Sequence, residues 1–181
     1  MKINFKKLSD TAIAPNKSHY NDSGFDLYAD EDVTLAYGET KAIATNIALE
    51  LPDGYMADVR PRSGLTRDTA LRVQYGTVDA GYRGGIGIIC ENANYGEDVY
   101  YTEKLFDITN AVSEIDVAVK INAAVAKWNS MAYQIKKGDK IAQLVIQKIP
   151  DIELIEADEL NETARGAGGF GSTGYSCRKG G

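Results

Sequence analysis

Short apolar runs, each ended by turn residues, constrain this chain more than any other feature of its sequence. At the N-terminus, Ile3 and Phe5 alternate with polar residues, which is the period of a strand with one buried face. The later apolar runs are 33–35, 42–51, 55–59 and 141–146, and turn signals such as Pro-Asp-Gly at 52–54 and Lys-Gly-Asp at 137–139 separate them. This spacing predicts an all-β sandwich or barrel built from many short strands. A helix of only a turn or two is expected, near Ser63.

Length, charge and cysteine content limit what kind of protein this is. The 181 residues are 44% hydrophobic and 25% charged, as expected for one ordinary globular domain. A net charge of −6 argues against binding to nucleic acid or to an anionic membrane surface. Two cysteines build no disulfide framework, and the sequence shows neither a signal peptide nor an apolar run of membrane-spanning length. We therefore expect a soluble cytoplasmic protein.

The stretch 76–85 (Gly-Thr-Val-Asp-Ala-Gly-Tyr-Arg-Gly-Gly) carries the densest cluster of residues suited to chemistry. Apolar residues lead into it and out of it, so a hairpin of two strands is predicted. Its one acid, Asp79, stands close to Tyr82 and Arg83 in a frame of glycines that leaves the backbone open to a ligand. A carboxylate on a stiff hairpin suits a general base, because its position is fixed before the substrate arrives. An ordinary turn would also explain the aspartate and the glycines.

Two polar clusters precede this hairpin. Asp26 lies in a strand-like run, where aspartate is disfavoured, so it either faces water on an edge strand or holds the waters around a Mg²⁺ ion. Further on, Arg60 and Arg62 precede the start of the short helix, where Ser63 suits the N-cap and Gly64 leaves the backbone open. Free N–H groups at a helix start beside two arginines make a phosphate site. An ordinary capped helix explains Ser63 equally well.

Two further candidates lie near the C-terminus. Gln143 interrupts an apolar run, so it either faces outward or donates a hydrogen bond to a ligand. Residues 150–162 are acidic and linker-like, and the tail 165–174 (Arg-Gly-Ala-Gly-Gly-Phe-Gly-Ser-Thr-Gly) is rich in glycine. A linker has no use for a Phe at its centre. A closing flap could lay Phe170 on a flat ring and turn its Arg, Ser and Thr side chains toward phosphate.

The segment between the hairpin and Gln143 differs from the rest of the chain. We divide the chain into a core of residues 1–91 and 132–164, an insertion of residues 92–131, and a flexible flap of residues 165–181. The insertion is expected to hold two or three short strands, although part of it could be helical. Its aromatic residues either anchor an interface with a partner protein or pack on themselves or on the assembly. They include Tyr95, Tyr100, Tyr101 and Trp128.

Five stretches, taken in order, resemble the motifs of the trimeric dUTPase family. They are residues 23–29 (Ser-Gly-Phe-Asp-Leu-Tyr-Ala), 61–65 (Pro-Arg-Ser-Gly-Leu), 76–84, 138–144 (Gly-Asp-Lys-Ile-Ala-Gln-Leu) and 165–174. The resemblance implies an all-β, jelly-roll-like barrel that forms a homotrimer with exchanged strands or tails, and three active sites each built from all three subunits. It also implies hydrolysis of dUTP to dUMP and pyrophosphate with Mg²⁺, which keeps uracil out of DNA. Gly81 and Ala167 stand where many members carry acids, at positions that vary in the family.

The resemblance also implies a role for each motif residue. Asp79 corresponds to the residue that activates water for attack on the α-phosphorus, and Tyr82 to the residue that stacks under deoxyribose and excludes a 2′-hydroxyl. Asp26 corresponds to an acid that acts near the metal through water, and Phe170 to the flap ring over uracil. The remaining substrate contacts correspond to Arg62, Ser63, Gly64, Gly76, Val78, Gln143, Arg165, Gly171, Ser172 and Thr173, of which Arg165, Ser172 and Thr173 match contacts to the γ-phosphate.

Two other interpretations stay open. A dCTP deaminase would share the fold and the tail, but it would use a Glu-based site in place of the hairpin aspartate, so Asp79 favours the dUTPase. A protein that binds nucleotide only to signal, with the insertion as its effector surface, is the alternative from another class. The insertion resembles the extra segment of some bacteriophage dUTPases, a group whose members also bind repressor proteins of mobile genetic elements. A repressor partner is therefore expected beside dUTP and dUMP, in the host cytoplasm if the chain is phage-encoded.

Overall fold

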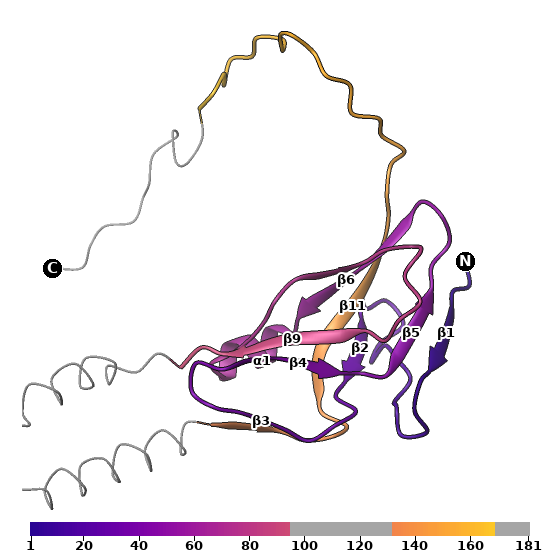
Figure 1. Cartoon of the computed structure of the whole chain (residues 1–181), viewed down its shortest axis with the longest axis vertical. Helices are drawn as coiled ribbons and strands as arrows, with labels where there is room; N and C mark the ends of the chain where they lie inside the picture. Colours follow the sequence, from indigo (N-terminus) through magenta and orange to yellow (C-terminus); the bar gives the residue numbers. More distant parts are fainter. Residues whose placement is uncertain (95–131, 169–181) are drawn as a thin grey trace, which may run out of the picture. The chain divides into compact units, whose positions relative to one another are not determined.

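The computed structural model describes residues 1–94 and 132–168 of the 181 (Figure 1). Within these residues, one six-residue helix accompanies short strands, turns and extended segments, which confirms the all-β class. The chain divides into two compact units, Met1–Pro150 and Asp151–Gly181. No helix in the described part of the chain is long and apolar enough to cross a membrane.

Short strands make up most of the first unit. In chain order the elements are β1 (Asn4–Lys7), β2 (Phe25–Tyr28), β3 (Val33–Leu35), β4 (Thr40–Ala44), β5 (Ile47–Glu50), β6 (Tyr55–Pro61), α1 (Ser63–Asp68), β7 (Leu71–Val73), β8 (Gly76–Val78), β9 (Gly87–Asn92), β10 (Tyr133–Ile135) and β11 (Lys140–Lys148). The turn expected at 137–139 is present between β10 and β11, where Gly138 has φ +91°. A left-handed backbone of this kind is the reason that a glycine is needed there.

The longest strand, β11, runs through the middle of one sheet. It pairs antiparallel with β2 on one side and with β6 on the other, and β8 completes a four-stranded sheet of order β2-β11-β6-β8. A three-stranded sheet has the order β4-β9-β7, while β1 pairs with β5 and β3 with β10. Fully buried side chains from both larger sheets, such as Leu144 and Ile88, belong to one hydrophobic core. Burial of apolar surface between short antiparallel sheets is therefore what holds the unit together.

The segment 70–92 departs from a simple hairpin. Its flanking runs do pair, as β7 with β9, so that part of the prediction is confirmed. The prediction of a plain glycine-rich turn between them is wrong, because β8 pairs with β6 in the other sheet. Residues 79–86, which we call the inter-sheet loop, connect the end of β8 in the four-stranded sheet to the start of β9 in the three-stranded sheet.

The described part of the second unit contains no helix or strand over residues 151–168. Its side chains from 151 to 167 are exposed, and they include four large apolar ones. These are Ile152, Leu154, Ile155 and Leu160, of which Leu154 is 95% exposed. The division into core, insertion and flap stays a prediction, since most of the insertion and of the flap lies outside the described residues.

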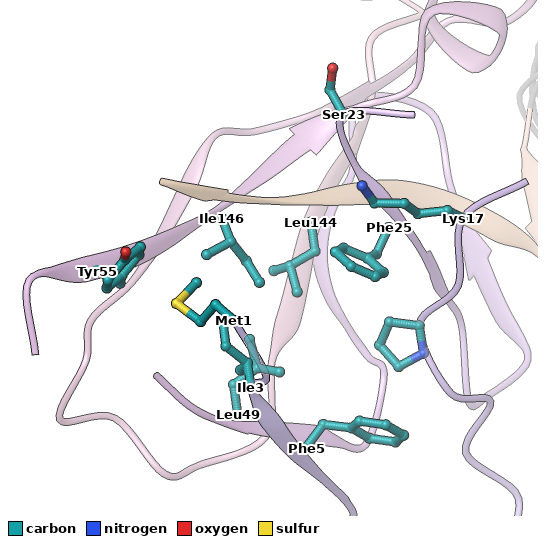
Figure 2. A pocket seen from close by; sticks show the side chains of 11 residues that line it. Met1, Ile3, Phe5, Lys17, Ser23, Phe25, Leu49, Tyr55, Leu144 and Ile146 are labelled. Atoms are coloured by element: carbon teal, nitrogen blue, oxygen red, sulfur yellow. The ribbon is translucent and has the colours of Figure 1, made fainter. Parts of the chain in front are cut away.

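A hollow of about 430 Å³ opens in the first unit beside β1 (Figure 2). Its lining is largely apolar and comes from β1, β2, β5, β6 and β11, with Ile3, Leu49, Leu144 and Ile146 facing it. Phe5, at its rim, remains 48% exposed. None of the predicted site residues within 1–94 and 132–168 lines this hollow, so among these residues it is an apolar surface separate from the polar motifs.

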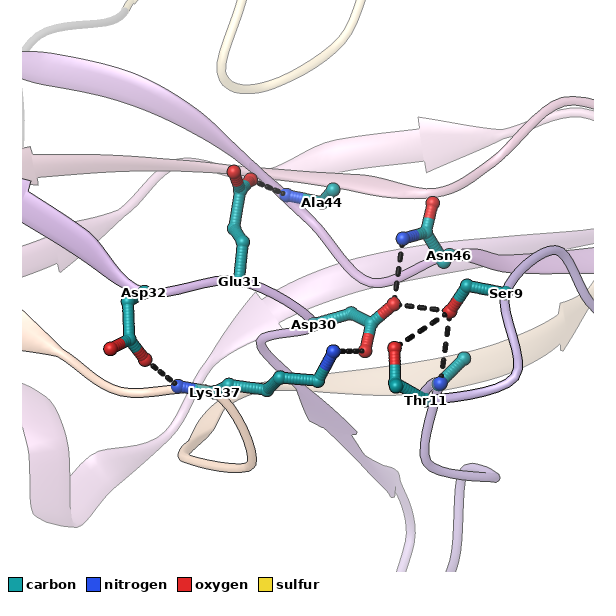
Figure 3. Close-up of polar contacts among 9 residues, drawn as sticks. Ser9, Thr11, Asp30, Glu31, Asp32, Ala44, Asn46 and Lys137 are labelled. Carbon is teal, nitrogen blue, oxygen red and sulfur yellow. Dashed lines mark hydrogen bonds and ion pairs between the residues drawn. The ribbon is translucent and has the colours of Figure 1, made fainter.

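Asp30 ties four loops of the first unit together (Figure 3). Its carboxylate accepts hydrogen bonds from the Ser9 hydroxyl and from Asn46 Nδ2 at 2.7 Å, and it forms an ion pair with Lys137 Nζ at 3.0 Å. The Asp30 side chain is almost completely buried. These partners lie before β2, between β4 and β5, and between β10 and β11, so one carboxylate holds together segments that are distant in the sequence.

Replacing this carboxylate should destabilise the fold in a pH-dependent way. The hydrogen bond from Ser9, then that from Asn46, holds the pKa of Asp30 well below its usual range. A depressed pKa in the folded state gives stability that is complete above the usual pKa, near 3.9, and is lost as the pH falls below it. We expect Asp30→Asn to lower the urea midpoint at pH 7, with the difference from the parent shrinking between about pH 5 and pH 2. A difference in urea midpoint between the parent and Asp30→Asn that stays constant down to pH 3 would contradict the view that the charge of Asp30 stabilises the fold.

Candidate active site

Asp79 begins the inter-sheet loop directly after the last residue of β8. Its side chain is exposed, and its carbonyl accepts a hydrogen bond from the Tyr82 N–H at 3.0 Å, which closes a turn. Because β8 is hydrogen-bonded to β6, the backbone that carries the carboxylate is fixed by a sheet. An exposed carboxylate on a held backbone is open to a water molecule and a substrate, as a general base requires.

The Tyr82 side chain is held against its own loop. Its hydroxyl donates a hydrogen bond to the Gly85 carbonyl at 3.0 Å, while the side chain as a whole remains 47% exposed. A Cβ at position 84 would lie 2.6 Å from Cζ of the tyrosine ring, so Gly84 lets the ring lie close over the backbone. Arg83 turns back to donate to the carbonyls of Ala80 and Tyr82. The loop therefore presents one carboxylate and one aromatic ring in a defined arrangement.

A second group of predicted residues lies at the start of α1. The helix begins at Ser63 as expected, but its N-cap is Arg62 in an extended conformation, and no side chain caps it. The prediction that Ser63 is the N-cap is therefore wrong. Ser63 and Gly64 are exposed in the first turn, where N–H groups lack intrahelical partners, and a Cβ at Gly64 would meet nothing within 4 Å. The exposed turn leaves room for an anionic group.

Asp26 lies on the edge strand β2, yet only 6% of it is exposed, so the interpretation of a water-facing acid is wrong. Its carboxylate is 2.8 Å from Lys140 Nζ and 3.2 Å from Arg62 Nε. Arg62 Nε is buried at this ion-pair distance without forming a hydrogen bond to any described residue, while Arg62 Nη1 donates to the Lys140 carbonyl. We call Asp26, Arg62 and Lys140 the ion triad. It carries two positive charges against one negative charge.

Sequence reasoning missed Lys140. The carboxylate of Asp26 raises the pKa of this lysine, mainly through the hydrogen bond between the two side chains, so the ammonium stays charged. Lys140 comes directly after the Gly138-Asp139 turn and opens β11, as one cation before an apolar run. Its position in the sequence could have marked Lys140 as a candidate site residue. Only the strand pairing, however, shows that β11 brings Lys140 beside β2.

Gln143 lies on β11, with one polar residue opposite it on each of the two neighbouring strands. It is directly opposite Asp26 on β2 and Arg60 on β6, so the three share one face of the sheet. A Cβ at Gly24 would lie 3.1 Å from the Cβ of Gln143, so a glycine is needed for the chain to pass this closely. Arg60 itself is paired with Asp58 at 2.7 Å. The predicted residues Asp26, Arg62, Ser63, Gly64 and Gln143 thus gather at one end of the four-stranded sheet.

The residues present fit a metal ion only through water. Across residues 1–94 and 132–168, no group of three or more His, Cys, Asp or Glu side chains could hold a cation. Asp26 is the predicted acid, and both of its oxygens face cationic side chains. Mg²⁺ commonly binds through one or two carboxylates, several waters and the phosphates of a substrate. Asp26 fits that outer role, and the described residues build no cage of their own.

Strand register separates the two groups of predicted residues. On β8, Gly76 pairs with Val59 and Val78 with Ala57, so Asp79 comes after β8 beside the Tyr55 end of β6. Ser63 follows the other end of β6. The strand from Met56 to Pro61 covers five residue steps of about 3.3 Å, or roughly 16 Å, before the chain reaches Ser63. One chain does not bring Asp79 and the ion triad around the same phosphate group.

The last group of predicted residues belongs to the second unit. Arg165 is exposed, and its Nε donates to the Gly168 carbonyl at 2.9 Å. The flap residues Phe170, Gly171, Ser172 and Thr173 lie outside the described residues, as do Tyr95, Tyr100, Tyr101 and Trp128 of the insertion. Their roles stay predictions.

Comparison with known proteins gives one consistent family. The family model described as dUTPase matches residues 10–105 and 106–174. Deoxyuridine 5'-triphosphate nucleotidohydrolases from Clostridioides difficile and Thermobifida fusca are each 38% identical to this chain over 96% of its length, covering 98% and 79% of the relatives.

Solved structures of bacteriophage enzymes have the same fold. A dUTPase variant from Staphylococcus bacteriophage 80alpha with dUpNHpp matches with TM-score 0.76 at 32% identity, covering 96% of this chain and 99% of that one. A dUTPase variant from phage phi11 of S. aureus is described as revealing the coordination of a structural Mg(II) ion. It matches with TM-score 0.66 at 29% identity, covering 88% of this chain and 98% of that one. The family match, the 38% identity over nearly the whole chain and the shared fold show that this chain belongs to the dUTPase family.

Proposed function

We propose that this chain hydrolyses dUTP to dUMP and pyrophosphate, with Asp79 as the general base. The observation that carries the proposal is the inter-sheet loop, where an exposed carboxylate on a sheet-held backbone follows β8 and an aromatic ring is held three residues on. Asp79 takes a proton from a water molecule as that water attacks the α-phosphorus. The bond between the α-phosphorus and the bridging oxygen breaks, and pyrophosphate leaves with its electron pair.

The ion triad and the start of α1 are suited to the phosphates. Arg62 and Lys140 share one carboxylate, so one positive charge remains, and either cation can turn from Asp26 to a phosphate oxygen. Exposed N–H groups at Ser63 and Gly64 add neutral donors. Gln143 lies beside this group on β11. Mg²⁺ bound with the triphosphate, and held through water by Asp26, would offset further charge and stabilise the departing pyrophosphate.

Tyr82 is proposed to select the sugar. The ring is fixed by the hydrogen bond from the Tyr82 hydroxyl to the Gly85 carbonyl, and the side chain is half exposed. One face of the ring can therefore pack against the C2′ side of a deoxyribose. A 2′-hydroxyl would then collide with the ring. UTP is thus rejected by a steric clash and not by a missing hydrogen bond, so no polar group is needed to discriminate against it.

We further propose that the active site is completed by other copies of the chain in a homotrimer. This proposal is supported by strand register, since Asp79 and the cations of the ion triad lie toward opposite ends of β6, and in the homotrimer a second copy would supply one of the two groups. The exposed apolar side chains of residues 152–160 need a surface to cover them, and the apolar hollow beside β1 in another copy is of suitable character. Passage of this segment onto a neighbouring subunit would carry the flap, with Arg165 and Phe170, toward that neighbour.

A nucleotide panel together with one substitution tests the reaction. The purified chain should release pyrophosphate from dUTP and little from dCTP, UTP or dTTP, whereas a deaminase would release ammonia from dCTP. We expect Asp79→Asn to keep dUTP binding but to lose roughly 10²-fold or more in kcat, the usual range for a general base. Asp10→Asn, the same change at an exposed aspartate outside the five motifs and outside residues 152–160, is the matched control. An unchanged kcat for Asp79→Asn would contradict the assignment.

Subunit mixing tests the shared site. A chain ending at Thr163 retains all described strands, so it should fold and assemble but turn over dUTP poorly because it lacks the flap. Mixed trimers of this chain with Asp79→Asn chains should regain activity, since each partner supplies what the other lacks. Verified mixed trimers that stay inactive would mean that each subunit completes its own site.

The insertion is proposed as a surface for a partner protein. Phage dUTPases similar to this chain, with TM-scores up to 0.76, are described as controlling transfer of virulence genes by a G protein-like mechanism. The insertion holds aromatic residues of the types that anchor interfaces, and none of the predicted catalytic positions. The partner class we propose is a repressor of a mobile genetic element.

Deleting this segment separates the two activities. Replacing residues 94–128 with a short Gly-Asn turn should preserve dUTP hydrolysis while abolishing capture of a repressor from host or phage extract. The two forms are compared at equal trimer content, with the captured protein identified by mass spectrometry. Equal capture by both forms would place the partner surface on the core or the flap, and capture by neither would remove the support for a regulatory role.

A further inference from the structure

The C-terminal end of the inter-sheet loop is held by one turn, residues 45–47, which connects β4 to the first residue of β5. Thr45 approaches the Ile86 carbonyl twice, through its N–H at 3.2 Å and its hydroxyl at 2.7 Å. On the other side, the Ile86 N–H donates to the Ile47 carbonyl at 2.8 Å. Both polar groups of the Ile86 backbone therefore end on this turn, and Thr45 and Ile86 are almost completely buried.

The turn itself has an unusual backbone. Asn46 has φ +50° and is the one non-glycine residue with positive φ among residues 1–94 and 132–168. Asparagine tolerates this left-handed region better than most residues, but at some cost that the surroundings must offset. Here the side chain donates to Asp30 at 2.7 Å and the carbonyl accepts the Leu8 N–H at 2.8 Å. Figure 3 shows the Asn46 amide directed at the Asp30 carboxylate, so the Asp30 cluster fixes the turn.

The residue next to this anchor holds the tyrosine ring. Gly85 precedes Ile86, and its carbonyl accepts the Tyr82 hydroxyl. Leu8 packs on the same spot, since its Cδ1 would lie 3.1 Å from a Cβ at position 85. A displacement of Ile86 therefore moves the hydrogen-bond acceptor of Tyr82, and the position of the ring depends on a turn that lies more than thirty residues earlier in the sequence.

We infer that Thr45 and Asn46 are positioning residues. They fix the position of the Tyr82 ring and thereby the discrimination between deoxyribose and ribose. The inference rests on the proposed function, because it concerns the same sugar site. Neither residue needs to touch the nucleotide. Thr45 acts through the Ile86 carbonyl, and Asn46 acts by holding the turn in its left-handed conformation.

The test compares kcat/KM for dUTP and UTP in four variants. Thr45→Val keeps the shape of the side chain and removes the hydroxyl, whereas Thr45→Ser keeps the hydroxyl and should restore the parent ratio. Asn46→Gly accepts the positive φ and removes only the link to Asp30. We expect the dUTP/UTP ratio to fall about three- to tenfold in Thr45→Val and in Asn46→Gly, the fold-change that corresponds to one hydrogen bond. Tyr82→Ala gives the ratio without any ring.

A stability-matched variant excludes a general loosening of the fold. Ile135→Val removes one methylene from a buried position on β10, which pairs with β3 and not with the inter-sheet loop. It should lower the melting temperature without changing the ratio. An unchanged ratio in both Thr45→Val and Asn46→Gly would overturn the inference, as would an equal fall in Ile135→Val. If Thr45→Val does not fold, Asn46→Gly against Ile135→Val decides the question.

Hydrogen exchange gives a readout that does not depend on turnover. Amide exchange in the peptide 79–87 should be faster in Thr45→Val and Asn46→Gly than in the parent and in Ile135→Val. Faster exchange there in a chain that does not hydrolyse dUTP would support the positioning of the loop and contradict the proposed function. Normal hydrolysis of dUTP with unchanged exchange and an unchanged ratio would overturn the positioning alone.

Discussion

The hydrogen-bond ladders of β6 determine where several candidate site residues of the first unit lie. β6 pairs with β11 on one side and with β8 on the other, so it sets the position of Gln143 and of Asp79 at the same time. Because β8 runs antiparallel to β6, its C-terminal end points away from α1. The proposed base is thereby placed toward the start of β6, and the groups proposed to bind phosphate lie beyond its end. This strand order supports the proposal that a nucleotide meets both groups where two chains of a homotrimer come together.

Local charge explains how an acidic chain can bind a triphosphate. With a net charge of −6, the long-range field opposes an anionic ligand. The ion triad concentrates two cations at one buried carboxylate, and Asp26 holds them close together before any ligand arrives. A phosphate that displaces Asp26 from one cation exchanges one anionic partner for another, so the rearrangement costs little electrostatic energy. The proposed role of Asp26 therefore includes the two cations that it holds as well as any metal-bound water.

The sequence predicted the local features well and the long-range ones poorly. The short strands, the turn at 137–139 and the short helix at Ser63 depend on neighbouring residues, and each is present, but the buried face expected for the N-terminal strand is wrong, because all four residues of β1 are exposed. The role of Lys140 and the burial of Asp26 depend on the pairing of β2 with β11, which joins residues more than a hundred positions apart. The same applies to β8, whose pairing with β6 turned an expected hairpin into a connection between sheets. The prediction of the N-cap residue also failed, because the N-cap is decided by the backbone geometry at Arg62 and not by the suitability of the Ser63 side chain.

The inter-sheet loop shows why such a connection suits an active site. Its first residue is fixed by the ladder of the four-stranded sheet, and its last residue by the 45–47 turn and the three-stranded sheet. Sliding of one sheet against the other would therefore move Asp79 relative to the Gly85 carbonyl that accepts the Tyr82 hydroxyl. The shared hydrophobic core, with Leu144 and Ile88 buried from the two sides, resists such sliding because packed interiors do not deform continuously. Core packing and the Asp30 cluster thus fix one short loop, which carries both the proposed general base and the residue proposed to select the sugar.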